Sequence, residues 1–215
     1  MIKTPWGYTL TDAESLPDFL TLSEFVEFTN NKFSIQDARI KTNIPAATRS
    51  IQNYCGWHVY PNLECEMVYR VFDIRDCIVG SDLVIQLPAT FVTSIKSVLL
   101  NASKVGSVWV GEPTTDFDLD ESGILRVYDF GYYDRRSKIY ILYDAGVGAE
   151  QMDLLKELVA NRVTHAVTSS YGVMSETAGS VSVSYNASWA GNTRSTALPD
   201  DNKEILNPFK VKGVY

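Results

Sequence analysis

The strongest constraint in this sequence is a change in the spacing of its apolar residues, which occurs twice along the chain. Apolar positions recur at helical steps before about residue 57, alternate with polar positions from about 58 to 144, and return to helical steps from Gln151. Steps of three and four place side chains on one side of a helix, whereas alternation places them on one face of a strand. The sequence therefore predicts short antiparallel strands between two helical stretches.

The first helical stretch is predicted to hold a short helix and a long one. Thr21 followed by Glu24 has the pattern of a capping box at the start of the short helix. The long helix is expected to begin at Ser34, to kink or break at Pro45, and to end at Gly56. Apolar residues recur along one face of this helix at Ile40, Ile44, Ala47, Ile51 and Tyr54.

The second helical stretch is predicted to be a long helix from Gln151 to about Ser170. A further strand is expected over 180–185, and a short helix is expected to end before Pro208. The predicted apolar face of the long helix consists of Met152, Leu155, Leu158, Val159, Val163 and Ala166.

These elements predict an α+β fold, in which a helical core of two long helices and several short helices carries an inserted small antiparallel β module. The expected organisation is an N-terminal arm over 1–20, a helical core over 21–57 and 148–207, an inserted β domain over 58–147, and a C-terminal docking tail over 208–215.

Charge and cysteine content exclude some classes of protein. The 19 Lys and Arg against 26 Asp and Glu give a net charge of −7, which disfavours broad binding to a phosphate backbone. Cys55, Cys65 and Cys77 have no C-x-x-C spacing, so we expect reduced cysteines in place of a disulfide framework or zinc site. The sequence lacks a signal-like apolar run and a membrane-length apolar segment, which favours a soluble intracellular chain.

Reactive side chains give few candidate sites. Cys55 and His58 are close enough in sequence to suggest a thiol nucleophile or half a metal site, but we favour packing roles for both. Asp116, Asp118 and Asp120 resemble the start of a calcium loop, yet Glu121 occupies the position that requires glycine, so an acidic turn is the preferred interpretation. Common phosphate-binding and hydrolase motifs do not occur, and the sequence predicts no cofactor and no resident metal.

One family resemblance extends over about 21 to 210. The chain resembles the head–tail connector, or adaptor, proteins of tailed bacteriophages. The motifs that carry this resemblance follow a short leading helix and occur in this order: Ala47-x-x-x-Ile51-x-x-Tyr54-x-Gly56-Trp57, Leu87-Pro88, Val92-Thr93-Ser94-Ile95-x-Ser97-Val98, Tyr143-Asp144-Ala145-Gly146 with the helix of 154–167, Ser175-Glu176-x-x-Gly179-x-x-Ser182-x-x-Tyr185, and Ile205-Leu206-Asn207-Pro208-Phe209-Lys210.

The resemblance implies a non-enzymatic virion protein located at the head–tail interface and made in the host bacterial cytoplasm. It implies a dodecameric ring that connects the capsid portal protein to tail terminator, stopper or tail proteins. Double-stranded DNA is expected to pass through the channel without sequence-specific binding, and no membrane partner is expected. A lumen of acidic chains would repel DNA, which favours transit.

The resemblance places the docking segment at the C-terminus, and aromatic residues at both ends of the chain suggest arms that become ordered on binding. The candidate portal or neck contacts are Leu206, Pro208, Phe209, Lys210, Lys212, Tyr215 and Trp6, and packing on the chain's own subunit is the alternative for the tail. The candidate tail-side or loop contacts are Trp109, Tyr132, Tyr133, Arg135 and Arg136.

Three alternative functions are compatible with the sequence. A tail terminator or stopper would occupy the same neck but bind the tail tube. A ligand-binding β module would use Trp109, Tyr132 and Tyr133 as a platform for carbohydrate or peptide. An enzyme would use Cys55 and His58, for instance as a thiol hydrolase.

Overall fold

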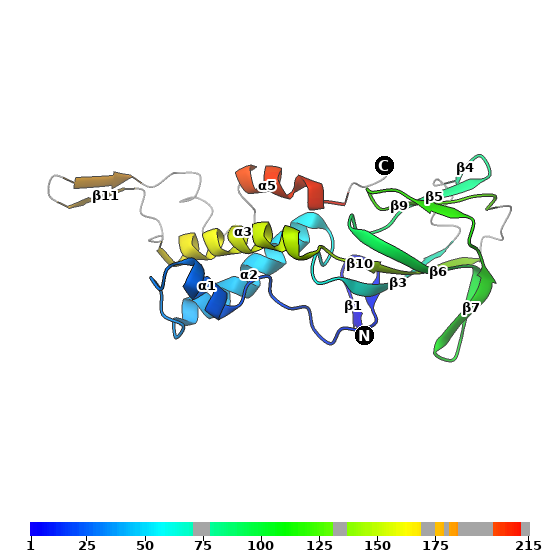
Figure 1. Cartoon of the computed structure of the whole chain (residues 1–215), viewed down its shortest axis with the longest axis horizontal. Helices are drawn as coiled ribbons and strands as arrows, with labels where there is room; N and C mark the ends of the chain where they lie inside the picture. Colours follow the sequence, from blue (N-terminus) through cyan, green and yellow to red (C-terminus); the bar gives the residue numbers. More distant parts are fainter. Residues whose placement is uncertain (71–77, 131–136, 169–174, 179–180, 185–199, 212–215) are drawn as a thin grey trace. The chain divides into compact units, whose positions relative to one another are not determined.

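The computed structural model describes residues 1–70, 78–130, 137–168, 175–178, 181–184 and 200–211 (Figure 1). The chain divides into two compact units, each assembled from separate stretches of sequence. The first unit comprises Met1–Leu16, Gly56–Gly148 and the described end of the chain from Phe209, and the second comprises Pro17–Cys55 and Ala149–Pro208.

The first unit contains a six-stranded antiparallel sheet with the order β1-β2-β3-β10-β6-β7. Its strands are β1 (Ile2–Lys3), β2 (Thr9–Leu10), β3 (Leu63–Arg70), β10 (Lys138–Ala145), β6 (Val92–Val105) and β7 (Val108–Pro113). Strand β10 pairs with β3 along its whole length and with β6 on its other side. It is therefore an interior strand of the sheet, and most of its residues are buried.

The first unit also contains a four-stranded antiparallel sheet with the order β4-β5-β9-β8. Its strands are β4 (Ile78–Val79), β5 (Asp82–Gln86), β9 (Ile124–Val127) and β8 (Phe117–Leu119). Alternate residues are buried on β5, β9 and β10, as expected for strands with one face in a core. These buried residues include Leu83, Ile85, Leu125, Val127, Ile139, Ile141 and Tyr143. The Tyr69 hydroxyl of β3 donates to the Gln86 carbonyl of β5 at 3.1 Å, which links the two sheets.

The second unit consists of helices and one small hairpin. The helices are α1 (Leu22–Phe28), α2 (Ala38–Cys55), α3 (Ala149–Thr168) and α5 (Asp200–Leu206), followed by the 3-10 turn η2 (Asn207–Phe209). Strands β11 (Ser175–Ala178) and β12 (Val181–Ser184) pair as an antiparallel hairpin, and β12 lies within the strand predicted over 180–185.

Local sequence accounts for the ends of the helices. The predicted capping box of α1 is confirmed, because Thr21 Oγ1 accepts from the Glu24 amide while a Glu24 carboxylate oxygen accepts from the Thr21 amide. Helix α2 is capped by Asp37, whose carboxylate accepts from the Arg39 amide at 2.9 Å, so the helix begins after the predicted Ser34 start. Gly56 has φ +80°, as predicted for the left-handed residue that ends α2.

Helices α2 and α3 pack against each other through their apolar faces (Figure 1). The buried residues of α2 include Ile40, Ile44, Ala47 and Ile51, which are four of the predicted positions. On α3 the predicted face is buried except at Ala166, which is exposed, and Val167 is buried next to it. Pro45 lies inside α2, which continues through it to Cys55 without dividing into two helices.

The predicted fold class is wrong. Two antiparallel sheets of six and four strands form most of the first unit, and the helices of the second unit are of short to moderate length. The structure is therefore not a helical core of two long helices with a small β insertion. Local periodicity identifies single helices and strands. It does not show how the strands assemble, and here they form two sheets with a core of their own.

Residues 1–20, expected to be an irregular arm, contain β1 and β2. Strand β2 pairs with β3 through Thr9 opposite Glu66 and Leu10 opposite Cys65. Tyr8, Leu10 and Phe19 are buried. These contacts join residues more than fifty positions apart, and such non-local pairing leaves no signal in a short window of sequence.

Candidate interaction surfaces

The predicted C-terminal docking segment is largely occupied by contacts within the chain. Leu206 is 0 % exposed and Phe209 is 4 % exposed, whereas Pro208 and Lys210 are exposed. Within the second unit, the Tyr54 hydroxyl lies 3.0 Å from Asn207 Oδ1 and 3.3 Å from the Lys203 carbonyl, which holds the end of α5 against α2. The candidates Lys212 and Tyr215 lie outside the described residues.

Phe209 belongs to an aromatic cluster of the first unit. Its ring centroid lies 5.4 Å from that of Phe91, which in turn stacks with Trp57 at 6.2 Å. The Trp57 indole Nε1 donates to the Phe209 carbonyl at 2.6 Å, and the Thr90 hydroxyl donates to the same oxygen at 3.3 Å. The surface that this segment offers to a partner is therefore Pro208 and Lys210, while Phe209 anchors the segment.

The N-terminal candidate Trp6 is half-buried, and its ring stacks on Tyr8 at 6.2 Å. Tyr8 is buried and bonded to His58, so the N-terminal segment is fixed to the sheet unit. The sequence does contain a weak sign of this strand, because Tyr8 and Leu10 alternate with polar residues. A two-residue strand is too short to identify by periodicity.

His58 lies in a buried polar network of the first unit. Its Nε2 is 3.0 Å from both the Pro61 and Ala145 carbonyl oxygens, which only accept, so Nε2 carries the proton. Nδ1 therefore accepts from the Tyr8 hydroxyl at 2.7 Å, and the Tyr8 oxygen accepts from the His58 amide at 3.0 Å. Burial lowers the pKa of His58 to about 4 and raises that of Tyr8. The neutral imidazole thus joins three segments of the chain.

The described cysteines are enclosed. Cys55 and Cys65 are reduced thiols, and both are 0 % exposed. Burial raises the pKa of Cys65 to about 12, which keeps it as the thiol, the form with little nucleophilicity. Cys77 lies outside the described residues.

The acidic turn between β8 and β9 is held together by its own carboxylate. Asp120 Oδ1 accepts from the Ser122 amide, the Ser122 hydroxyl and the Ile124 amide at 2.8 to 2.9 Å. These bonds lower the pKa of Asp120 despite its partial desolvation. Among the described residues, no group of three or more His, Cys, Asp or Glu side chains is arranged to hold a metal ion.

Trp109 lies on β7, on the face of the sheet that also carries Tyr140. Their ring centroids are 5.2 Å apart, and the ammonium groups of Lys104 and Lys138 lie 5.6 and 6.0 Å from the centre of the indole ring. The ring is therefore a packed, positively flanked part of the sheet. The other candidate tail-side or loop contacts, Tyr132, Tyr133, Arg135 and Arg136, lie outside the described residues.

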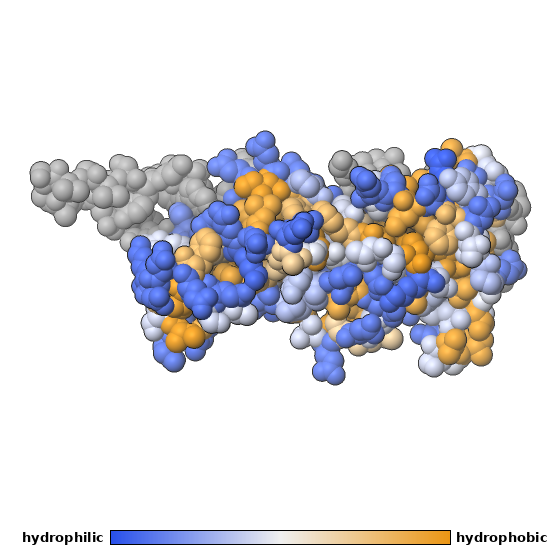
Figure 2. All heavy atoms as spheres, in the orientation of Figure 1, coloured by the Kyte–Doolittle hydropathy of each residue, from blue (hydrophilic) through white to orange (hydrophobic). Residues whose placement is uncertain are grey.

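The opposite face of the β6–β7 hairpin carries three exposed valines, which sequence analysis did not single out. Val105 pairs with Val108, and Ser103 pairs with Val110, so the three valines point to the same side. They are 63 %, 61 % and 44 % exposed. We call Val105, Val108 and Val110 the valine face. Figure 2 shows hydrophobic surface at the tip of this hairpin.

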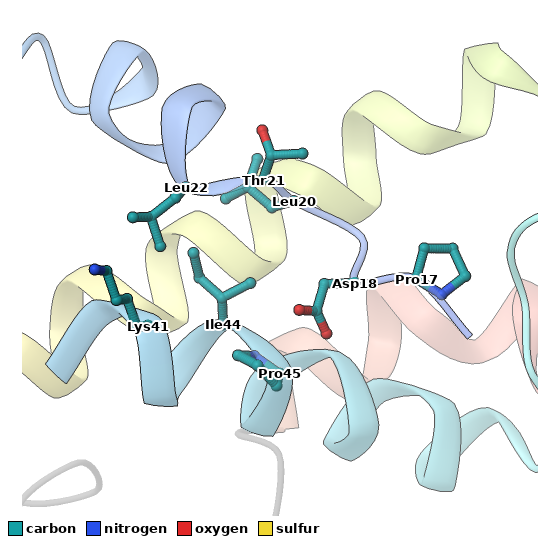
Figure 3. A pocket seen from close by; sticks show the side chains of 8 residues that line it. All are labelled: Pro17, Asp18, Leu20, Thr21, Leu22, Lys41, Ile44 and Pro45. Carbon is teal, nitrogen blue, oxygen red and sulfur yellow. The ribbon is translucent and has the colours of Figure 1, made fainter. Parts of the chain in front are cut away.

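The second unit contains an open pocket between residues 17–22 and the first half of α2. It has a volume of about 460 Å³. Figure 3 shows Leu22 and Ile44 pointing toward each other across it, with Asp18 beside Pro45 and Lys41 near Leu22. Its lining is mostly apolar and consists of Pro17, Asp18, Leu20, Thr21, Leu22, Lys41, Ile44 and Pro45. Burial raises the pKa of Asp18, against the opposing effect of Arg49.

No helix in the described part of the chain is both long and apolar enough to span a membrane. A scan against models of protein families gave no match for this chain, and a search of curated proteins gave no significant match.

Proposed function

We propose that this chain is a structural virion protein that forms a ring between the capsid portal and the tail of a bacteriophage. The observation that carries the proposal is the ordered series of motifs from the first short helix to the Ile205-Leu206-Asn207-Pro208-Phe209-Lys210 segment. Each motif is short, but their common order over most of the chain is typical of head–tail connector proteins.

The acidic character of the chain supports this role. A channel formed by many copies of a chain with net charge −7 would repel DNA phosphates, so genome DNA would pass without adhering. The proposed action depends on surfaces presented to neighbouring copies and particle parts, and it requires no cofactor.

The contacts that hold the C-terminal segment in place make the proposal more specific. Pro208 and Lys210 are exposed next to Phe209, whose ring and carbonyl are fixed by Phe91 and Trp57. A rigidly held edge loses less conformational entropy on docking than a free arm does. We therefore propose that the portal contacts Pro208 and Lys210 as part of a preformed surface.

The test is assembly with defined partners. Purified protein is mixed with the portal protein, and separately with tail protein, and each mixture is analysed by co-sedimentation and electron microscopy. Co-sedimentation with the portal and a ring in the images are expected. Binding to the tail protein alone would instead favour a tail terminator or stopper. Failure to join either neck component would contradict the proposed function.

A further inference from the structure

The valine face has the properties of a contact surface. Isolated exposed valines are common on soluble proteins, but three on one side of a hairpin form a continuous apolar stripe. Strand β7 is also an edge of its sheet, and Figure 1 shows the hairpin extending away from the neighbouring strands. Covering this stripe would remove apolar surface from water without disturbing the core of the unit.

The shape of the hairpin is fixed by its backbone. Pairing is irregular between Leu100 and Ser103 of β6, and Asn101 in that stretch has φ +50°. Gly111 of β7 lies opposite, where a Cβ atom would be 2.6 Å from the Leu100 carbonyl oxygen. The bulge and this glycine set the direction of the hairpin tip, so the valines are presented on a defined framework.

The pocket of the second unit is a chemically suitable receptor. Its lining combines apolar side chains such as Leu22 and Ile44 with one acidic and one basic residue, Asp18 and Lys41. On the hairpin, the exposed Glu112 lies on the same side as Val108 and Val110, whereas Lys104 pairs with Trp109 on the other face. The two surfaces therefore match in their apolar side chains and in one pair of opposite charges, Glu112 beside the valines and Lys41 in the pocket.

We propose that the valine face of one copy of this chain docks into the pocket of the next copy. The inference rests on the proposed function, because a ring supplies many copies at a fixed spacing. A contact between two different surfaces of the same chain is heterologous, which is the type that closes cyclic rings. Each copy offers both an exposed hairpin and an open pocket, so one contact type can repeat around the ring.

Crosslinking between chains that each carry one added, exposed cysteine tests the pairing, with the buried Cys55 and Cys65 left in place. One chain carries Val108→Cys and another carries Lys41→Cys, both at exposed positions, and Cys77→Ser is present in both. Mixed chains under mild oxidation are expected to give a disulfide-linked dimer, at a yield about tenfold or more above the controls. Neither chain alone is expected to crosslink, because a heterologous contact needs one cysteine on each side.

Two matched controls define the background. Val79→Cys places a cysteine on another hairpin valine, which is 63 % exposed, and is paired with Lys41→Cys. Glu157→Cys lies on the exposed face of α3 and is paired with Val108→Cys. A mixed-dimer yield no higher than these controls at near-millimolar protein overturns the inference. Dimers formed by the Val108→Cys chain alone would also overturn it, because they would indicate a symmetric contact.

A charge in the stripe tests its role in assembly. Val108→Asp is expected to lower the association constant of the full chain about tenfold or more, because the carboxylate would enter an apolar pocket. Val79→Asp is expected to leave association unchanged. Rings that form normally with Val108→Asp overturn the inference but leave the proposed function standing. Specific crosslinking without any binding to portal or tail would support the docking and contradict the proposed function.

Discussion

At the scale of single residues, the His58 network shows how a side chain that resembles a catalytic group serves the fold. Both ring nitrogens make hydrogen bonds to Tyr8, Pro61 and Ala145, which belong to separate stretches of the first unit. A buried polar group contributes to stability only while every partner is present. The network therefore makes the N-terminal segment part of the sheet unit.

Removing the Tyr8 hydroxyl is predicted to destabilise the first unit. Tyr8→Phe removes the hydrogen bond that the hydroxyl donates to His58 Nδ1 and the one that it accepts from the His58 amide, at a cost of about 1 to 3 kcal/mol. Urea unfolding at pH 7 measures the change in the free energy of unfolding. Tyr128→Phe, at an exposed tyrosine, is the control and is expected to stay within about 0.5 kcal/mol of the wild type. Equal stability of both variants would contradict the network.

Stability is predicted to fall as the pH decreases from about 6.5 to about 4. His58 has a folded pKa of about 4 against 6.5 in the unfolded chain, so the unfolded state binds more protons in this window. The contribution is fully present above pH 6.5, and its loss on acidification is on the order of 3 kcal/mol.

The measurement compares urea unfolding at pH 7 and pH 5 for the wild type and for His58→Gln. The variant is expected to lose most of the pH dependence over this interval. His165→Gln is the matched control, because desolvation also lowers the pKa of His165, but this half-buried side chain lies on α3 of the second unit. An unchanged pH dependence in His58→Gln would show that another group titrates.

At the scale of elements, short-range patterns identified the start of α1 and the end of α2, whereas burial depended on the partner segment. The capping box of α1 is a local hydrogen-bonding arrangement, and it is joined by an ion pair from Lys156 of α3 to Glu24. Together these contacts lower the pKa of Glu24 to about 2. Glu24 thus helps to fix the start of α1 and also attaches α1 to α3.

Loss of the cap is predicted to destabilise the second unit. Thr21→Ala removes the oxygen that accepts from the Glu24 amide, at a cost of about 1 kcal/mol. Thr42→Ala, at an exposed position inside α2, is expected to be neutral or slightly stabilising because alanine favours helix. Urea unfolding monitored by circular dichroism measures both effects. A similar loss from the two substitutions would contradict the role of the cap.

The 3-10 turn η2, which follows α5, provides a second prediction at this scale. Phe209→Ala is predicted to lower the free energy of unfolding by about 3 to 5 kcal/mol, because it leaves a cavity beside Phe91 and Trp57. Phe28→Ala, at a phenylalanine that is 47 % exposed, is expected to cost much less. A small effect at Phe209 in thermal unfolding would show that this segment is an appendage, as the sequence suggested.

At the scale of the whole molecule, net charge governs how the chain interacts with a large charged partner such as DNA. The acidic balance predicts that the full chain does not bind double-stranded DNA at physiological ionic strength, because it has no excess of cations with which to release DNA counterions. Fluorescence anisotropy with a labelled duplex measures this. Binding that weakens steeply with added salt would reveal a basic surface and contradict an inert channel.

The sequence by itself determined the features that depend on neighbours along the chain. The spacing of Ile40, Ile44 and Ile51 specified a helix face, and Thr21 with Glu24 specified a cap. These signals are local because backbone hydrogen bonding and side-chain direction repeat within a few residues. The same locality made alternation in the middle of the chain a reliable sign of strands.

Only the tertiary structure decided which distant segments share a core. It placed Tyr8 against His58 and Phe209 against Phe91, and thereby made both chain ends part of the sheet unit. It also left Val105, Val108 and Val110 exposed, although the sequence places them among ordinary strand residues. Burial is a property of what lies opposite a side chain, and a partner fifty or more residues away leaves no periodic trace in the sequence.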